Sequence, residues 1–263
     1  MQETSALYRQ ILSSTDYFFE TRVVIGDSGN LITEGGEQIL FGGTAIVVAR
    51  TGPDSGFDEN IIFSVKTSLN MFDNEPVIGK AVAGEINLEI IQPSGDIPRM
   101  GVVIPYVRAI RYEDEQEISS EWLQQGTFFI DTRETSHNDD GLEILTLHGY
   151  DAMLKAEQDY ASTNLNWPAL DTAVVSEIAS KMGVSVDART WAVMTDGYTF
   201  PIPASFTLRE MLGYIAGAYA GCFIMTELGQ LRLVTMTELP KETKYLVDEY
   251  GYVLTFGGTR ILI

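Results

Sequence analysis

The chain has 263 residues, with 17 Lys and Arg against 37 Asp and Glu, so its formal net charge is −20 with both His neutral. A surface this acidic repels polyanions, which argues against a general nucleic-acid binder and against adhesion to anionic membranes. Apolar residues make up 45% of the chain, enough to bury a substantial core, so bulk disorder is not expected.

The chain begins with a short amphipathic segment. Residues 4–14 place Leu7, Tyr8 and Ile11 on one helical face, so we expect an N-terminal helix within residues 1–15 that docks on a neighbour. The same stretch lacks an apolar signal region, which predicts synthesis in a reducing cytoplasm.

Residues 16–149 carry the pattern of a β domain. Short runs rich in β-branched and aromatic residues alternate with Gly, Asp, Asn and Pro clusters, which is typical of a sandwich or barrel. The expected strands are 18–25, 44–50, 61–66, 85–91, 102–112, 127–133 and 143–148. Glu85, Asn87 and Glu89 alternate with apolar residues, so one face of their strand should be buried and the other wet or in contact with a partner.

After residue 149 the apolar period becomes helical. Residues 173–182 predict a helix with Asp171 or Thr172 as its N-cap and Gly183 after its last turn. The apolar stripe of this helix consists of Val174, Val175, Ile178 and Met182.

A second helix is expected after Phe206, where Thr207 and Glu210 form a capping-box pattern. Its apolar face consists of Leu208, Met211, Leu212, Ile215 and Tyr219, and we expect Gly221 to end it. Residues 222–226 and 231–236 then predict a hairpin. Residues 150–240 are therefore expected to form an α+β domain, which makes the chain α+β and mainly β.

The uncharged run 211–225 resembles a membrane span, with Gly213, Gly217 and Gly221 at GxxxG spacing. As a helix it would reach about 22 Å, short of the roughly 30 Å hydrocarbon core. We therefore expect these glycines to serve packing in a soluble domain and predict no membrane span.

A faint internal repeat surrounds two FGGT segments, at residues 41–44 and 256–259. Both follow a strand-and-turn pattern and precede an apolar run, so residues 241–263 are interpreted as the start of a second β-barrel. The apolar end at residues 261–263 either pairs inside an assembly or continues in the natural protein.

The Gly-Asp-Ser-Gly segment around Ser28 resembles the nucleophile segment of trypsin-like proteases. That mechanism needs a His base, which precedes the Ser in that family, but His137 and His148 both follow it. A tight hairpin turn over residues 25–31 is the favoured interpretation.

His137, Asn138, Asp139 and Asp140 offer a His and two carboxylates. They lack the ligand pattern of zinc or calcium sites, so they predict a polar loop joining two strands between residues 133 and 143. His148 is interpreted as structural, the acidic run 113–117 as a solvated loop or partner surface, and Cys222 as an inert buried thiol. The single cysteine excludes an intrachain disulfide. No catalytic residue, metal site or cofactor is predicted.

Four segments in succession carry a family resemblance: residues 76–88, 126–133, 147–155 and 208–233. Together they resemble the N-terminal part of the tail hub or tail-associated proteins of long-tailed phages and prophages, whose contractile counterpart is the baseplate hub. The resemblance implies a β-barrel related to tail-tube proteins, an α+β domain and a second tube-like barrel.

The same resemblance implies a function without catalysis. Such hubs form homotrimers whose two barrels per subunit make a pseudo-sixfold ring that continues the tail tube and closes its tip. The implied partners are distal tail or tail-tube proteins and the tape-measure protein, and the implied location is the virion tail tip. DNA would pass through without specific binding, and a negative channel wall would explain part of the −20 charge.

Two alternatives remain open. The Ser28 segment and scattered carboxylate pairs suggest a hydrolase acting on peptide or glycan. Trp122, Trp167 and Trp191, together with twelve tyrosines, suggest a carbohydrate-binding β module, provided that aromatic side chains gather on the surface.

Overall fold

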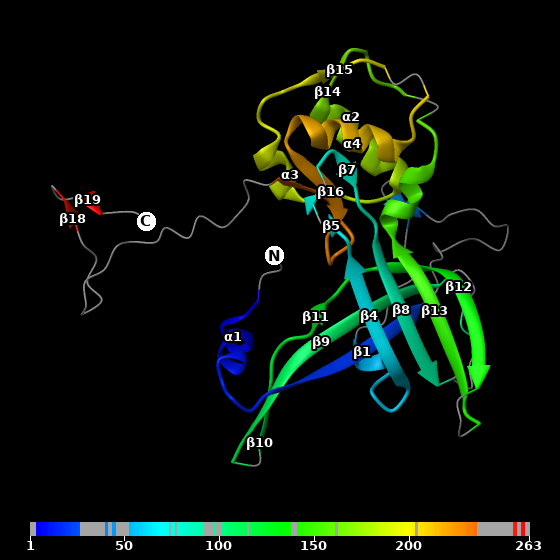
Figure 1. The fold of residues 1–263 in the computed structure, drawn as a ribbon, viewed down its shortest axis with the longest axis vertical. Coiled ribbons are helices and arrows are strands. Elements are labelled where there is room, and N and C mark those ends of the chain that lie inside the picture. The colour runs from blue at the N-terminus through cyan, green and yellow to red at the C-terminus, as the bar shows by residue number, and fades with distance from the viewer. Residues whose placement is uncertain are drawn as a thin grey trace.

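A computed structural model gives the fold of the chain (Figure 1). It describes residues 4–26, 40–41, 44–45, 53–73, 75–76, 78–91, 97, 101–114, 116–137, 141–160, 163–202, 205–235, 255–256 and 259–260. The N-terminal helix is confirmed as α1 (Ala6–Leu12), where Ser5 Oγ accepts a hydrogen bond from the backbone N–H of Tyr8. Ile11 is fully buried on the side of α1 that packs against β9, whereas Leu7 stays exposed.

One large antiparallel sheet contains most of the expected strands. Its main strands are β1 (Phe18–Gly26), β4 (Ile62–Leu69), β8 (Gly84–Ile91), β9 (Val102–Glu113), β12 (Phe128–His137) and β13 (Glu143–Asp151). They are ordered β1-β9-β12-β13-β8-β4, and β10 (Gln116–Ser119) and β11 (Leu123–Gln124) also pair with β9. The alternation expected in β8 is confirmed, because its even-numbered residues are all buried.

The sheet wraps around its own core. Every main strand contributes apolar side chains to one cluster, among them Val23, Ile86, Leu88, Val103, Ile130, Leu145 and Val65. The segment that precedes β4 contacts β1 at an isolated bridge, in which Val23 and Phe57 exchange two backbone hydrogen bonds of 3.0 and 2.8 Å. Among the described residues no ladder of backbone pairs joins β4 to β1. In this part of the chain the sheet is therefore wrapped but open.

The helical part lies at one end of the sheet (Figure 1). It contains η2 (Ala152–Glu157), α2 (Asp171–Met182), α3 (Ala188–Val193) and α4 (Leu208–Ala218), with the strands β7 (Lys80–Ala81), β16 (Gly221–Met225) and β17 (Leu231–Thr235). These strands form a small mixed sheet in the order β17-β16-β7, in which β7 runs parallel to β16. A second apolar core unites α2, α4 and this sheet, so the α+β character and the hairpin at its end are confirmed.

Short elements complete the described chain. They are β2 (Leu40–Phe41), β3 (Thr44–Ala45), η1 (Pro53–Ser55), β5 (Phe72–Asp73), β6 (Glu75–Pro76), β14 (Ala169–Leu170), β15 (Thr199–Phe200), β18 (Thr255–Phe256) and β19 (Thr259–Arg260). Both FGGT segments form the same small hairpin, since Phe41 pairs with Thr44 and Phe256 pairs with Thr259. The expected strand over 46–50 and the remainder of the repeat lie outside the described residues.

The glycines of α4 pack against the backbone of β7. A Cβ on Gly213 would lie 2.8 Å from the carbonyl oxygen of Gly79, and a Cβ on Gly217 would lie 3.6 Å from the Gly79 Cα. Gly79 itself has a φ of +70°. The predicted packing role is confirmed, and among the described helices none is long and apolar enough to cross a membrane.

The ends of the two long helices differ in part from expectation. The Thr207 and Glu210 capping box of α4 is confirmed, but the helix ends at Ala218 and Ala220 takes the left-handed conformation, with φ +48°. Gly221 opens β16 instead, where a Cβ would collide with the carbonyl oxygen of Val234. The prediction that Gly221 ends the helix is therefore wrong, because close strand pairing and not helix termination requires glycine there.

In α2 the expected glycine is confirmed, since Gly183 follows the last turn with φ +69°. The expected side-chain cap is not formed, because Asp171 is the first helical residue and residue 170 makes no capping bond. The Asp171 carboxylate instead accepts hydrogen bonds from the Tyr198 backbone N–H and the Tyr219 hydroxyl. It thereby joins the start of α2 to the end of α4.

We predict that Gly213→Ala lowers the free energy of unfolding by about 1–3 kcal/mol, because the added methyl group collides with rigid backbone. Gly217→Ala is the matched control on the same helix. A methyl group at position 217 makes an ordinary van der Waals contact, and alanine stabilises a helix by up to about 1 kcal/mol relative to glycine. Urea denaturation measures both variants, and equal stability of the two would contradict the packing described.

Candidate functional site

The residues weighed for hydrolysis or metal binding do not form a site in the described structure. Ser28 and residues 138–140 lie outside the described residues. His148 on β13 pairs with Thr132 on β12, whereas His137 lies five residues further along β12. At about 3.3 Å per residue the two histidines are roughly 16 Å apart, too far to act together. Within the described ranges no three metal-ligating side chains come together.

Two of these residues have clear structural surroundings. His148 packs edge-on against Tyr150, with ring centroids 4.8 Å apart. His137 ends β12, so the strand extends beyond the predicted boundary at residue 133, and residues 134–136 belong to the strand and not to a loop. The strand continues this far because residues 134–136 pair with residues 144–146 of β13.

The lone cysteine is buried as expected, whereas the described residues of the acidic run are exposed but form a strand hairpin and not the expected loop. Glu113 ends β9, Asp114 turns with φ +49°, and Glu117 lies on β10, so the described carboxylates of the run surround a hairpin tip. The Glu113 side chain is exposed and pairs with Arg111 at 2.8 Å. Cys222 is buried in β16, and burial raises the pKa of its thiol, which disfavours the reactive thiolate.

The three tryptophans do not form an exposed stacking platform. Each is half-buried. The guanidinium groups of Arg22 and Arg108 lie over the Trp122 ring, at 5.3 and 4.7 Å from its centroid. Trp167 packs against Tyr160 at 6.1 Å, and Trp191 packs against the core of the helical part. The aromatic surface that a carbohydrate-binding module requires is therefore not supplied by these residues.

Exposed aromatic residues gather elsewhere, on a projection that we call the arm. The arm consists of residues 18–22 of β1, residues 108–113 of β9, and β10, and Figure 1 shows it extending away from the helical part. Phe18, Phe19 and Tyr112 are 45%, 48% and 59% exposed. Phe18 stacks on Tyr112, whereas Phe19, on the opposite face of β1, contacts Tyr17. Both faces of the arm thus present aromatic side chains, which is the usual mark of a surface that another molecule covers.

Ion pairs and cation–π contacts join the strands at the base of the arm. Glu20 bonds to Arg22 at 3.1 Å and to Arg108 at 2.6 Å, and both guanidinium groups lie over Trp122. Ion pairs and cation–π contacts together hold β1, β9 and the residues after β10 in one arrangement. The aromatic residues beyond this base are therefore presented in a fixed orientation.

A second surface, which we call the polar face, is the side of β12, β13, β8 and β4 that points away from the core. Three of its cross-strand rows are mainly polar: Glu134, Thr146, Glu89 and Ser64; then Thr132, His148, Asn87 and Lys66; then Phe129, Tyr150, Glu85 and Ser68. The next row consists of Ser136, Ile144 and Ile91. Ser64 Oγ donates to Glu89 at 2.9 Å. Three carboxylates therefore stand against one ammonium group on a broad hydroxyl-lined surface.

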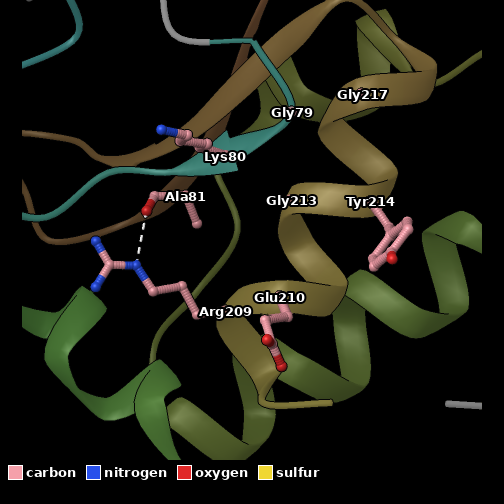
Figure 2. Close-up of a pocket in the computed structure, with 8 residues that line it drawn as sticks. All are labelled: Gly79, Lys80, Ala81, Arg209, Glu210, Gly213, Tyr214 and Gly217. Carbon is pink, nitrogen blue, oxygen red and sulfur yellow. Dashed lines mark hydrogen bonds between the residues drawn. The ribbon is translucent and has the colours of Figure 1, made fainter. Parts of the chain in front are cut away.

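An open groove of about 590 Å³ lies between β7 and α4 (Figure 2). Gly79, Gly213 and Gly217 form its floor, and Tyr214 and Lys80 border it. The Arg209 Nε donates to the carbonyl oxygen of Ala81 at 2.8 Å, and the same guanidinium pairs with Glu157. This arginine therefore fastens α4 to β7 and η2.

The junction between the sheet and the helical part centres on Asp151. Its Oδ2 accepts from the Gly84 backbone N–H at 2.6 Å, and its Oδ1 accepts from the Met153 backbone N–H at 2.9 Å. Burial raises the pKa of this carboxyl to about 6, and the two N–H donors and the Arg209 charge only partly oppose the rise. Sequence analysis assigned it no role, although an Asp between an apolar strand and a short helix is a recognisable N-cap signal.

No protein-family model matches the sequence, and no curated protein matches it either. Solved structures are similar to it in fold. The crystal structure of the prophage MuSo2 43 kDa tail protein from Shewanella oneidensis has a TM-score of 0.51 and 12% identity, over 88% of this chain and 59% of that chain. The tail protein from Neisseria meningitidis MC58 has a TM-score of 0.45 and 13% identity, over 89% of this chain and 53% of that one.

This chain thus spans about three fifths of the length of the MuSo2 protein. The predicted resemblance to prophage tail proteins is confirmed as a similarity of fold.

We predict that the Cys222 thiol of the native chain does not react with an aromatic disulfide reagent on the timescale of minutes and reacts fully in urea. Burial and the raised pKa both lower the thiolate concentration at the surface. Ser205→Cys supplies the control, because residue 205 is exposed and its thiol should react at once. If Cys222 reacts as fast as that surface thiol, it is not inert.

Proposed function

We propose that this chain is a structural component of a phage or prophage tail tip, a hub that continues and closes the tail tube and attaches distal tail parts. The observation that carries the proposal is the similarity of fold to the MuSo2 tail protein, which extends over 88% of this chain. In this proposal the wrapped sheet is the tube-like barrel, spanning residues 16–149, and the α+β domain spans residues 150–240. A second barrel begins within residues 241–263.

In the proposed hub, copies of the chain associate as a homotrimeric ring. The arm supports this, because the part of the chain that the structure describes leaves aromatic side chains exposed on both of its faces. Contacts made by an arm on a different surface of the next copy are heterologous, and heterologous contacts form a ring where the rotation from copy to copy closes. Tail-tube proteins and the tape-measure protein are the further partners of this ring.

The polar face is the proposed channel wall. Glu85, Glu89 and Glu134 give it an excess of carboxylates, and its three mainly polar rows carry one apolar side chain among the described residues, Phe129. Carboxylates on a channel wall repel phosphates over the roughly 8 Å Debye length at physiological salt. DNA would then pass without being held, with no catalytic step.

We predict that Phe18→Glu converts the oligomer to monomers while the fold persists, because an exposed aromatic anchor is replaced by a charge in the interface. A central anchor of this kind contributes about 2 kcal/mol or more, which weakens association roughly 30-fold. Sedimentation velocity measures the change, and Leu228→Glu, at a position 64% exposed in the turn between β16 and β17, is the control. A wild-type chain that stays monomeric at high concentration would refute the ring.

We further predict that a ring carrying Glu85→Lys and Glu134→Lys retains duplex DNA at low salt, whereas the wild-type ring does not. Charge reversal replaces repulsion of phosphates by attraction, which salt then weakens. Glu59→Lys with Glu143→Lys is the control of equal charge, because both residues are exposed and lie outside the polar face. Equal DNA retention by both double variants would show that net charge alone, and not this face, controls DNA contact.

A further inference from the structure

The groove between β7 and α4 carries apolar side chains that the described part of the chain leaves exposed. Tyr214 is 59% exposed at its border, and Ile78, the residue before Gly79 of the floor, is 46% exposed. Phe206 stacks on the Tyr214 ring with centroids 4.9 Å apart, so one face of that ring is already covered. The groove volume of about 590 Å³ lies within the range of pockets that enclose whole small molecules, so aromatic side chains fit into it.

A cation without a partner in the described structure borders the same groove. Among the described Lys and Arg side chains, Lys66 and Lys80 make no ion pair, hydrogen bond or aromatic contact. The other described ones already interact with carboxylates, backbone carbonyl groups or aromatic rings. Lys80 is exposed on β7, and Figure 2 shows it and Tyr214 on either side of the glycine floor.

The arm presents the opposite charge next to its aromatic residues. Its hairpin tip carries Glu113 and Glu117, which pair with arginines of β9, and Asp114 between them. Asp114 is exposed, and its carboxylate makes no ion pair or hydrogen bond with the described residues. Phe18 and Tyr112 stack on each other beside this tip. The arm therefore lacks apolar cover and a cation, and the groove offers both.

We propose that the arm of one copy inserts into the groove between β7 and α4 of the next copy. In this contact Phe18 and Tyr112 pack against Tyr214, and Asp114 lies near Lys80. The inference rests on the proposed function, because it names the surface that the arm covers on the neighbouring copy of the ring. Figure 1 shows the arm extending away from the helical part, so the contact joins different surfaces of two copies and is heterologous.

The polar face is the other surface that offers an unpaired cation, Lys66. It suits the arm less well, because Glu85, Glu89 and Glu134 lie on the same face and repel the acidic tip. Its hydroxyl and carboxylate groups also provide little apolar cover for aromatic rings. Charge and apolar character together therefore favour the groove.

Cross-linking of two variants of the full chain tests this contact. One variant carries Asp114→Cys and the other carries Lys80→Cys, while the native Cys222 is buried. When the two are mixed, a short bismaleimide should link one to the other, and it should link neither variant to itself. Leu228→Cys in place of Lys80→Cys is the control, because that exposed position lies at the far end of the β16–β17 hairpin.

Sedimentation velocity on the same samples separates this contact from the proposed function. Oligomers that form without a link between Asp114→Cys and Lys80→Cys would overturn the contact and leave the ring standing. Linked species that grow into open chains of increasing mass would support the contact and overturn the closed ring. Chains that stay monomeric at high concentration would overturn both.

Two lysine variants with the same change of charge provide a second test. Lys80→Glu should weaken association about 2–5-fold, the range expected for one exposed ion pair. Adding Asp114→Lys to that variant should restore association, because the two charges are exchanged. Lys66→Glu is the matched control and should leave association unchanged. If Lys66→Glu weakens association and Lys80→Glu does not, the arm contacts the polar face and the proposal is overturned.

Discussion

The contact of the Gly79 backbone with α4 is the constraint on which the arrangement of the helical part depends. Only a glycine at position 213 lets β7 approach the helix this closely, and β7 is then held by pairing with β16 and by Arg209. Three residues after β7 ends, the same chain enters β8 at Gly84, where Asp151 binds it. Short backbone approaches and one buried carboxylate therefore fix how the two parts meet.

The two faces of the wrapped sheet carry different kinds of side chain. Its inner side is apolar and supplies the core, while the polar face offers carboxylates and hydroxyls in ordered rows. Three exposed aromatic residues, Phe18, Phe19 and Tyr112, lie on the arm, where the guanidinium groups of Arg22 and Arg108 lie over Trp122. A protein built for assembly needs such a division, because surfaces that contact partners and surfaces that stay wet require opposite chemistry.

Local patterns predicted much of the fold. Alternation in β8 and the capping box of α4 depend on neighbouring residues, so the sequence was sufficient for both. The role of Gly221 was missed, because its close contact comes from Val234 on another strand. The Gly84–Asp151 hydrogen bond and the guanidinium groups over Trp122 also join residues distant in sequence, and no local period encodes such contacts. The run of Tyr17, Phe18 and Phe19 could have indicated the exposed arm, but aromatic residues also favour strands, and only a strand was predicted there.

The central claim is that copies of this chain form a ring whose channel is lined by the polar face. A cryo-EM reconstruction of the assembled chain, at a resolution that traces the strands, tests this most directly. The account predicts a closed ring in which Glu85, Glu89 and Glu134 point into the channel and Phe18 and Tyr112 are covered by the neighbouring copy. A ring with the polar face on its outer surface or buried between copies, or the absence of any ring, would contradict it.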